Sequence, residues 1–428
     1  MLFVPPDPKT GQALLLLLSV PLSFVLRFIS KPLLKHLFSV FIGVFGCFWA
    51  FGGLAWHVVL PPIGVFLIMK FLRTIEKTLH LSRKIVTSTV SLLIFSHLLY
   101  VHVWREFFLP QKYSSGTGFE GSLQITVLRM ISVLFCYADS SVDDKSLTKY
   151  QQKHKLKHMP TFIEFISYSL SFVTISVGPW IEIDHYIASM NRNKNPKGST
   201  RVFFIKLGEF FICAIPAFLG LRYFNKEWLL RVTDSQPAHI VLLVTYLFGT
   251  LAALKYEAAW LLGECSCIGS TLSYDDESKE WNKCTNIVLK SVELPTSPRE
   301  SITGWNRLVS KWLNHYVNAR VSKKKELDDH SVIRSSFSGM FITFMASALW
   351  HGIRPGYFIF FALLFVGQMS SKLWYKRITP ILPENTIIKA VYRAGGFITG
   401  RFLPAVLKNA LDFPCISFYL LYCWYTGS

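Results

Sequence analysis

Residues 37–69 read LFSVFIGVFGCFWAFGGLAWHVVLPPIGVFLIM, an apolar run without a single Lys, Arg, Asp or Glu. A helix crosses a hydrocarbon core of about 30 Å with roughly 20 apolar residues. This run is therefore long enough for two passes through a membrane, and it predicts helices that lie in lipid rather than in water.

Comparable apolar runs recur along the chain, at residues 12–29, 85–108, 123–138, 162–180, 202–221, 240–262, 336–350, 357–369 and 413–425. Several are short or interrupted by Pro, so we expect about 9–11 transmembrane helices together with some re-entrant or interfacial helices. The sequence thus predicts an all-α polytopic integral membrane protein. Because no internal repeat or low-complexity tract divides the chain, a single membrane-embedded domain over residues 1–428 is the simplest organisation.

The composition excludes an ordinary soluble globular protein. Apolar residues make up 51% of the 428 positions and charged residues only 17%, whereas soluble domains carry roughly a quarter charged residues. The mean hydropathy is +0.36. A chain this poor in charge lacks the residues that keep a large surface hydrated.

The net charge of +19 is confined largely to segments between the apolar runs, such as residues 70–84, 145–157, 192–206 and 320–334. Cytoplasmic loops of membrane proteins are enriched in Lys and Arg, which also attract anionic lipid headgroups. The charge therefore indicates contact with the lipid bilayer and needs no nucleic acid partner. A second reading is that some of these residues bind an anionic co-substrate, such as one bearing the phosphates of coenzyme A.

His351 is the most informative single residue. It lies in MASALWHGIRP, residues 345–355, where an apolar stretch meets Gly352 and Pro355 and a helix is expected to end. Ionisable residues at membrane depth are costly and indicate function by default. The alternative is an interfacial His that hydrogen-bonds a helix end.

Asn306 stands in an equally unusual setting, within the aromatic and basic stretch 305–320. Trp305, Leu308, Trp312 and Tyr316 recur at helical spacing, which predicts one aromatic face of an amphipathic helix at the membrane interface. A buried amide must find hydrogen-bond partners. Asn306 is therefore either a functional group or a helix cap.

Several familiar catalytic patterns are absent from the sequence. It holds no H-x-x-x-x-D, G-x-S-x-G, phosphate-binding G-x-x-x-x-G-K-[ST] or H-E-x-x-H pattern. His154 and His158 have a metal-ligand spacing, but the segment HKLKH is rich in lysine and contains no carboxylate. We therefore expect no metal site.

Four stretches together resemble the membrane-bound O-acyltransferase family, and within it the lysophospholipid acyltransferases. They are GWN at 304–306 followed by W-L-x-x-Y at 312–316, then SALWHGIRPGY at 347–357, MPTFIEFISYSLSFVTISVGPWIEIDHY at 159–186 and LKYEAAWLLGECSCIG at 254–269. The resemblance covers roughly residues 123–368. The W-H-G-x-x-P-G-Y run is its most specific part.

The resemblance implies that His351 is the catalytic histidine and Asn306 its polar partner, within a fold built around a central acyl-transfer cavity. It also implies acyl-CoA as co-substrate, a lysophospholipid as acceptor and no tightly bound cofactor. His351 would act as general base, a role for which an imidazole suits neutral pH. Residence in the endoplasmic reticulum membrane is a further implication of the family.

Other residues of these motifs are candidates for substrate contacts. We expect the aromatic ones to shape the cavity wall and bind substrate: Trp305, Trp312, Tyr316, Trp350 and Tyr357. The basic ones near Asn306 are candidates for contacts to CoA phosphates, with a solvated cytoplasmic loop as the alternative: Lys311, Arg320, Lys323 and Lys324.

Other functions remain open from the sequence, among them a non-catalytic membrane scaffold. Branches of the same family that acylate a protein or peptide share the histidine, so His351 does not separate them from lysolipid enzymes. A membrane transporter could use intramembrane charges such as Arg27, Glu209 and Glu257, although the chain lacks the repeats that such folds often carry.

Overall fold

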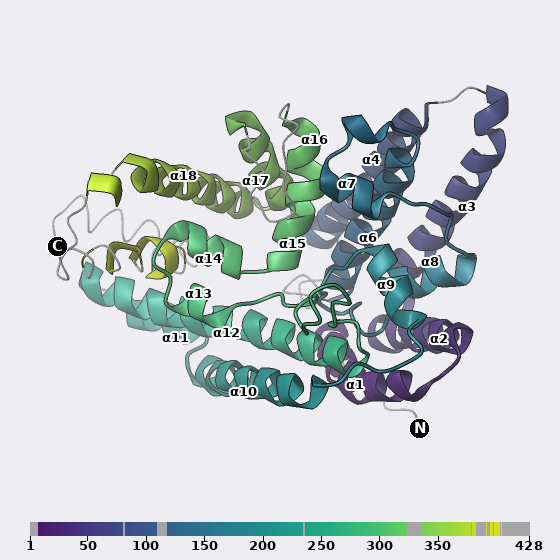
Figure 1. The fold of residues 1–428 in the computed structure, drawn as a ribbon. Coiled ribbons are helices and arrows are strands. Elements are labelled where there is room, and N and C mark those ends of the chain that lie inside the picture. Colours follow the sequence, from purple (N-terminus) through teal and green to yellow (C-terminus); the bar gives the residue numbers. More distant parts are fainter. Residues whose placement is uncertain are drawn as a thin grey trace. The chain divides into compact units, whose positions relative to one another are not determined.

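A computed structural model describes residues 7–79, 82–108, 118–233, 236–322, 336–377 and parts of 379–404. Within these residues every regular element is helical (Figure 1). Seven helical segments are long and apolar enough to cross a membrane: Pro8–Phe28, Pro32–Thr74, Arg83–Phe107, Phe119–Asp139, Ser199–Tyr223, Ala238–Gly269 and Pro355–Arg377. The second of these contains a tighter turn at Gly52–Ala55. The prediction of an all-α polytopic membrane protein is confirmed.

The longer helices are α1 (Pro8–Phe28), α2 (Pro32–Phe51), α3 (Trp56–Leu79), α4 (Arg83–Phe107), α6 (Phe119–Asp139), α10 (Ser199–Tyr223), α12 (Ala238–Gly269), α17 (Phe337–His351) and α18 (Pro355–Arg377). The shorter α-helices are α7 (Lys149–His154), α8 (Phe162–Ser169), α9 (Ile183–Met190), α11 (Lys226–Thr233), α13 (Leu289–Glu293), α14 (Pro298–Gly304), α15 (Arg307–Trp312) and α16 (Ala319–Val321). Tighter or wider turns form η1 (Gly52–Ala55), η2 (Asp144–Ser146), η3 (Leu313–Asn318), η4 (Thr379–Ile381) and η5 (Ile398–Phe402).

The apolar run 37–69 is divided between the two helices α2 and α3. η1 separates α2 from α3 at a Gly pair, and Gly52 has a φ of 56°, a conformation that favours glycine. The predicted span at residues 413–425 lies outside the described residues. The predicted spans at 336–350 and 357–369 correspond to α17 and to part of α18.

The predicted span 162–180 is not one continuous helix. α8 ends at Ser169, and the chain then runs through turns until α9 begins at Ile183. Arg129 of α6, which is fully buried, donates to the backbone carbonyls of Tyr168, Ser169 and Thr174 at 3.1 to 3.2 Å. These hydrogen bonds satisfy carbonyl groups that an uninterrupted helix would have satisfied itself.

The chain divides into two compact units. Unit 1 comprises Met1–Lys206, Leu262–Thr285 and Lys311–Thr343, and unit 2 comprises Leu207–Leu261, Asn286–Ser310 and Phe344–Ser428. α6 is the central helix of unit 1, because it packs against α1, α3, α4, α7 and α8 and most of its residues are buried. That a single domain spans residues 1–428 stays a prediction.

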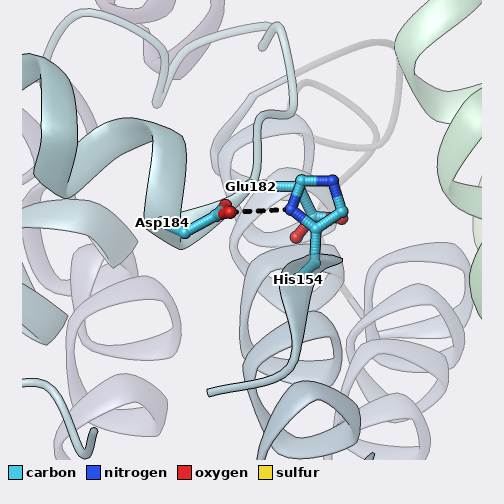
Figure 2. A group of neighbouring side chains, drawn as sticks. All are labelled: His154, Glu182 and Asp184. Carbon is cyan, nitrogen blue, oxygen red and sulfur yellow. Dashed lines mark hydrogen bonds and ion pairs between the residues drawn. The ribbon is translucent and has the colours of Figure 1, made fainter. Parts of the chain in front are cut away.

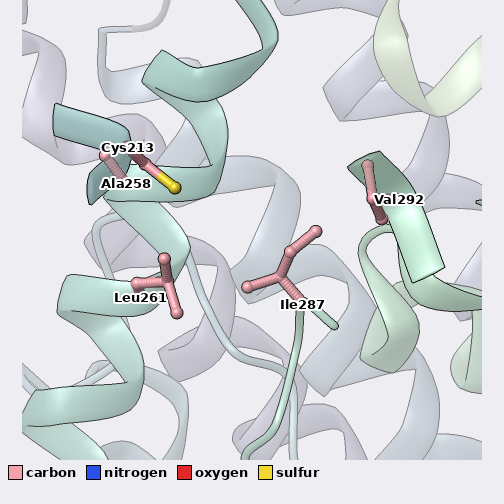
Figure 3. Packing of buried hydrophobic residues seen from close by; sticks show 5 residues of the cluster. All are labelled: Cys213, Ala258, Leu261, Ile287 and Val292. Atoms are coloured by element: carbon pink, nitrogen blue, oxygen red, sulfur yellow. The ribbon is translucent and has the colours of Figure 1, made fainter. Parts of the chain in front are cut away.

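Unit 2 is held by an apolar cluster of Cys213, Ala258, Leu261, Ile287 and Val292 (Figure 3). Ile287 lies between Leu261 of α12 and Val292 of α13. The side chains of Trp260 and Trp305 pack against the same cluster. Close packing of this kind fixes the segment between Ile287 and Trp305 relative to α12. α14 in turn packs against α13, α18 and η5.

The acidic loop that follows α12 neutralises part of the basic charge of unit 1. Asp276 pairs with Arg192 at 2.6 Å, Glu277 with Lys153 at 2.7 Å and Asp275 with Lys283 at 3.0 Å. Such exposed pairs contribute little to stability individually. They do show that some of the loop lysines and arginines already have carboxylate partners within the protein.

Candidate active site

His351 is the last residue of α17, and its side chain is half-buried. Gly352 follows with a φ of 142°, a conformation that L side chains rarely adopt. The Gly352 N–H still donates to the Ala348 carbonyl at 3.1 Å, and α18 begins at Pro355. The predicted helix end at this histidine is confirmed, and it places the imidazole at the junction between two helices.

Three aromatic side chains surround the His351 ring. Trp350 contacts it edge to face at a centroid distance of 4.7 Å. The rings of Tyr357 and Phe361, both in α18, lie nearly parallel to it, with centroid distances of 5.7 and 5.2 Å. Offset stacking and edge-to-face contacts are the preferred geometries of such rings. The surrounding rings therefore fix the plane of the imidazole. Of the three, Phe361 is not among the residues predicted from the sequence.

Asn306 lies between α14 and α15 in a left-handed backbone conformation, with a φ of 42°. Among non-Gly residues Asn adopts this region most readily. The helix predicted over 305–320 therefore begins only at Arg307, and Trp305 lies outside it as the C-cap of α14. Leu308, Trp312 and Tyr316 are all buried in the protein, so they share one face as the spacing predicts, but protein rather than a membrane interface covers that face.

The chain around Asn306 is paired with the segment that begins at Asn286. The Val288 N–H donates to the Gly304 carbonyl at 3.0 Å, and the Arg307 N–H donates to the Asn286 carbonyl at 2.8 Å. Gly304 is required for this approach, since a Cβ there would lie 2.8 Å from the Cβ of Ser291. Asn306 is thus held from both sides along the chain.

His351 and Asn306 belong to the same compact unit. α14 ends directly before Trp305 and Asn306, and it packs against α18, which begins four positions after His351. The structure therefore brings the two motif-bearing segments, 45 positions apart in sequence, into one packed body. Trp305 contacts Trp260 of α12 edge to face, at 4.9 Å.

Trp312 and Tyr316 belong to unit 1, where both are buried. The Trp312 indole N–H donates to Ser132 Oγ at 2.9 Å and to the Leu128 carbonyl at 3.0 Å, both on α6. The Tyr316 hydroxyl lies 2.7 Å from Glu182 Oε1. In this structure the polar atoms of both aromatics serve contacts within unit 1.

The basic candidates near Asn306 differ in their surroundings. Arg320 is bound by both carboxylate oxygens of Asp139, at 3.0 and 2.8 Å. Lys311 places its ammonium 5.3 Å from the ring centre of Tyr150. Lys323 and Lys324 lie outside the described residues.

A second polar cluster, in unit 1, surrounds Glu182. The hydroxyls of Tyr150 and Tyr316 both donate to this buried carboxylate. Beside it, His154 Nδ1 and Asp184 Oδ2 lie 2.8 Å apart (Figure 2). Each of His154, Glu182 and Asp184 offers a ligand atom, and these atoms lie within 4.8 Å of one another, so the three could hold a metal ion.

The ionisation of this cluster follows from burial and from its hydrogen bonds. Burial raises the pKa of the Glu182 carboxyl against the opposing charge of His154. Burial also disfavours ionised Asp184, yet the hydrogen bond and charge of His154 outweigh it and lower the pKa of Asp184. Burial, followed by the charges of Lys311, His154 and Arg320, lowers the pKa of His315 to about 3. His315 stacks on Tyr150 with ring centres 3.5 Å apart.

Neither Asn286 nor Glu182 is marked as functional by a pattern in the sequence. Asn286 lies 20 positions before Asn306 in a segment without a recognisable pattern, and only the fold brings the two together. Glu182 stands in the GPWIEIDHY stretch, within the resemblance described above, but nothing in that stretch distinguishes it from Asp184.

Comparison with known proteins gives one family match and several relatives of similar length or longer. Residues 41–403 match the model of the MBOAT, membrane-bound O-acyltransferase family. A lysophospholipid acyltransferase of Saccharomyces cerevisiae is 26% identical over 74% of this chain and 57% of its own length. Lysophospholipid acyltransferase 2 of Arabidopsis thaliana is 28% identical over 85% of this chain and 78% of its own length. Lysophospholipid acyltransferase 5 of Mus musculus is 26% identical over 89% and 77%.

The family match covers most of the chain and includes the Asn306 and His351 segments. It agrees with the multi-pass helical fold. The chain spans little more than half the length of the yeast relative. The activity of that relative is therefore not assigned to this chain from the match alone. The chain belongs to the membrane-bound O-acyltransferase family.

Proposed function

We propose that this protein is a lysophospholipid acyltransferase that moves a fatty acyl group from acyl-CoA to the free hydroxyl of a lysophospholipid. The observation that carries the proposal is the position of His351 in its ring of aromatic side chains, in the same unit as Asn306. The three relatives named above, at 26–28% identity, carry the name lysophospholipid acyltransferase, which favours this acceptor.

His351 acts as the general base in this proposal. Its neutral ring takes the proton of the acceptor hydroxyl while that oxygen attacks the thioester carbonyl carbon. The tetrahedral intermediate collapses with cleavage of the C–S bond, and the departing CoA sulfur receives the proton from the imidazolium. The fixed ring plane supports this role, because a base that is already oriented loses little conformational freedom when the substrates bind.

Asn306 assists either by orienting the imidazole or acceptor or by stabilising the oxyanion. A donor to the developing oxyanion typically contributes about 10²–10³-fold to kcat. An amide suits either task, because it carries both an acceptor and two donor hydrogens.

The substrates are held by the aromatic and basic residues of the two motifs. Trp305, Trp350 and Tyr357 belong to unit 2 with the catalytic pair, so they are our first candidates for the acyl and acceptor chains. Trp312 and Tyr316 stay candidates for substrate contacts from the sequence motif, and both belong to unit 1. For the CoA phosphates Lys311, Lys323 and Lys324 remain candidates. Arg320 is a weaker one, because Asp139 already engages its guanidinium.

The reaction needs no tightly bound cofactor, since the thioester of acyl-CoA supplies the activated acyl group. A lysophospholipid already resides in the leaflet and a CoA moiety comes from the cytosol, which is consistent with an enzyme of the endoplasmic reticulum membrane.

The proposal is tested with purified protein in nanodiscs, one acyl-CoA and a panel of lysophospholipids that differ in headgroup. We expect acylation of at least one headgroup, lost in His351→Ala and retained in His239→Ala, a substitution of an exposed histidine in α12. Turnover of an acyl-acceptor peptide with no lysolipid acylated would instead identify a protein acceptor. Lysolipid turnover that survives His351→Ala would refute the assigned base.

A further inference from the structure

Asn286 is 1% exposed, and three hydrogen bonds join it to the Asn306 segment. Its backbone carbonyl accepts from the Arg307 N–H at 2.8 Å, and its side-chain Oδ1 accepts from the Leu308 N–H at 3.0 Å. Its Nδ2 donates to Asn306 Oδ1 at 3.2 Å. One buried side chain thus engages both the backbone after Asn306 and the Asn306 amide itself.

These bonds fix which end of each amide faces which partner. The oxygen and nitrogen of an Asn amide are usually assigned from the hydrogen-bond network rather than seen. The backbone N–H of Leu308 can only donate, so the Asn286 atom that faces it must be the amide oxygen. This assigns the orientation of the Asn286 amide. The Asn286 nitrogen must then face Asn306, and as a donor it requires the Asn306 oxygen.

We infer that Asn286 is a positioning residue that turns the Asn306 amide nitrogen toward the reacting groups, so that Asn306 acts as a hydrogen-bond donor. The inference deepens the proposed function and rests on it. With its oxygen turned toward Asn286, the Asn306 amide directs its two N–H donors away from Asn286. A donor suits the negative charge that develops on the thioester oxygen as the hydroxyl attacks.

The backbone supports the same orientation. Asn306 has a φ of 42°, and the chain on either side of it is tied by the Val288–Gly304 and Asn286–Arg307 hydrogen bonds. Backbone and side chain are therefore fixed together before substrate binds. Such preorganisation is what gives a donor its effect on a transition state.

The first test compares Asn306→Asp with Asn306→Ala. Asp keeps the oxygen that faces Asn286 but has no N–H donor, so we expect both variants to lose about 10²–10³-fold in kcat. Near-normal kcat in Asn306→Asp, with activity lost in Asn306→Ala, would show that Asn306 works as an acceptor and would overturn the inference. Full activity in Asn306→Ala would instead remove Asn306 from the proposed mechanism, which is a distinct failure.

The second test changes the orienting residue. Asn286→Asp keeps an oxygen for the Leu308 N–H but presents a second oxygen to Asn306, whose amide must then flip to donate. We expect kcat to fall about 10²-fold while KM for lysophospholipid and for acyl-CoA stays within about twofold. Combined with Asn306→Ala, Asn286→Asp should cause no further loss of kcat, because the group that it reorients is already gone.

A structural role alone would give a different pattern. Asn286→Asp would then lower activity by the same factor in both backgrounds, and that result would overturn the inference. Asn318→Asp is the matched control, since it places the same change at another buried asparagine, in unit 1. The control should shift the melting temperature without the selective loss of kcat. If Asn286→Asp does not fold, the comparison of Asn306→Asp with Asn306→Ala decides the donor role.

Discussion

Gly304, two residues before Asn306, lies where any side chain would collide with Ser291. The absence of a Cβ atom at this position therefore affects where Asn306 lies. The pairing with α13 leaves no room for a Cβ at this position, and that pairing sets where Trp305 and Asn306 begin. Catalytic groups must be held to within a fraction of an ångström, and a displacement of about 1 Å can cost about 10²-fold in rate. The small residue is therefore part of the positioning of Asn306.

Gly304→Ala should lower kcat about 10- to 100-fold because the added methyl group pushes the Asn306 segment away from Ser291. The matched control is Gly367→Ala in α18, where a Cβ would meet nothing within 4 Å. That control should keep full activity and melt at the same or a higher temperature, because Ala is the better helix former. Initial rates and thermal melts of the purified variants measure both effects. Equal rates in the two variants would contradict the account.

His315 is expected to make the protein less stable in acid. Its pKa is lowered from 6.5 to about 3 in the folded state, so the unfolded chain takes up a proton below pH 6.5 and the folded one does not. Stability is therefore lost progressively as the pH falls from 6.5 toward 3. His315→Phe keeps the ring stack on Tyr150 and removes the titration. Melts at pH 7 and pH 5 should show a smaller decrease in the variant; equal decreases would argue against this role.

At the scale of residues, the sequence predicts the helix end at His351 but not the backbone conformation of Asn306. The helix end at His351 could be predicted because Gly352 and Pro355 carry their own backbone preferences. The conformation of Asn306 could not, because ITGWNRLVSKW has helical spacing throughout. The left-handed turn is set by hydrogen bonds to Asn286, which lies 20 positions away.

At the scale of elements, the connection between α8 and α9 depends on α6. Arg129 is fully buried and donates to three carbonyls of that connection, while Trp180 donates to Ser132 at 3.1 Å. The apolar run 162–180 predicted a spanning helix because hydropathy records only the cost of placing side chains in lipid. The hydropathy of this run does not indicate that Arg129, on another helix, donates the hydrogen bonds that a continuous helix would otherwise supply.

Arg129→Leu should destabilise the protein by about 3 kcal/mol, because it leaves at least two buried carbonyls without partners at about 1–3 kcal/mol each. Arg201→Leu, which changes an exposed arginine of α10, is the control and should have little effect. Thermal melts in the same detergent compare them. A melting temperature for Arg129→Leu that equals that of the wild type would show that these hydrogen bonds are dispensable.

At the scale of the whole molecule, the hydropathy pattern anticipated the class of fold and most long helices. It could not anticipate the division into two compact units, which depends on which faces pack together rather than on how apolar each helix is. Nor could it anticipate that the acidic loop would pair with basic loops distant in sequence, such as Asp276 with Arg192.

Activity should not depend on a metal ion, although His154, Glu182 and Asp184 could hold one. The phenols of Tyr150 and Tyr316 already donate to the Glu182 carboxylate, and the proposed acyl transfer uses His351 as its base. Dialysis against EDTA should leave the rate unchanged within error, and added Mg²⁺ or Zn²⁺ should not raise it. A loss on chelation that Asp184→Asn reproduces would establish a metal site instead.

In the proposed mechanism His351 is the general base for the transfer of an acyl group from acyl-CoA to a lysophospholipid. The most direct measurement follows radiolabelled acyl-CoA into phospholipid by the purified protein in nanodiscs, for the wild type and for His351→Ala. The account predicts labelled phospholipid and an equal amount of released CoA thiol in the wild type, with both reduced at least about 10²-fold in the variant. Labelled phospholipid formed equally by both proteins would contradict it.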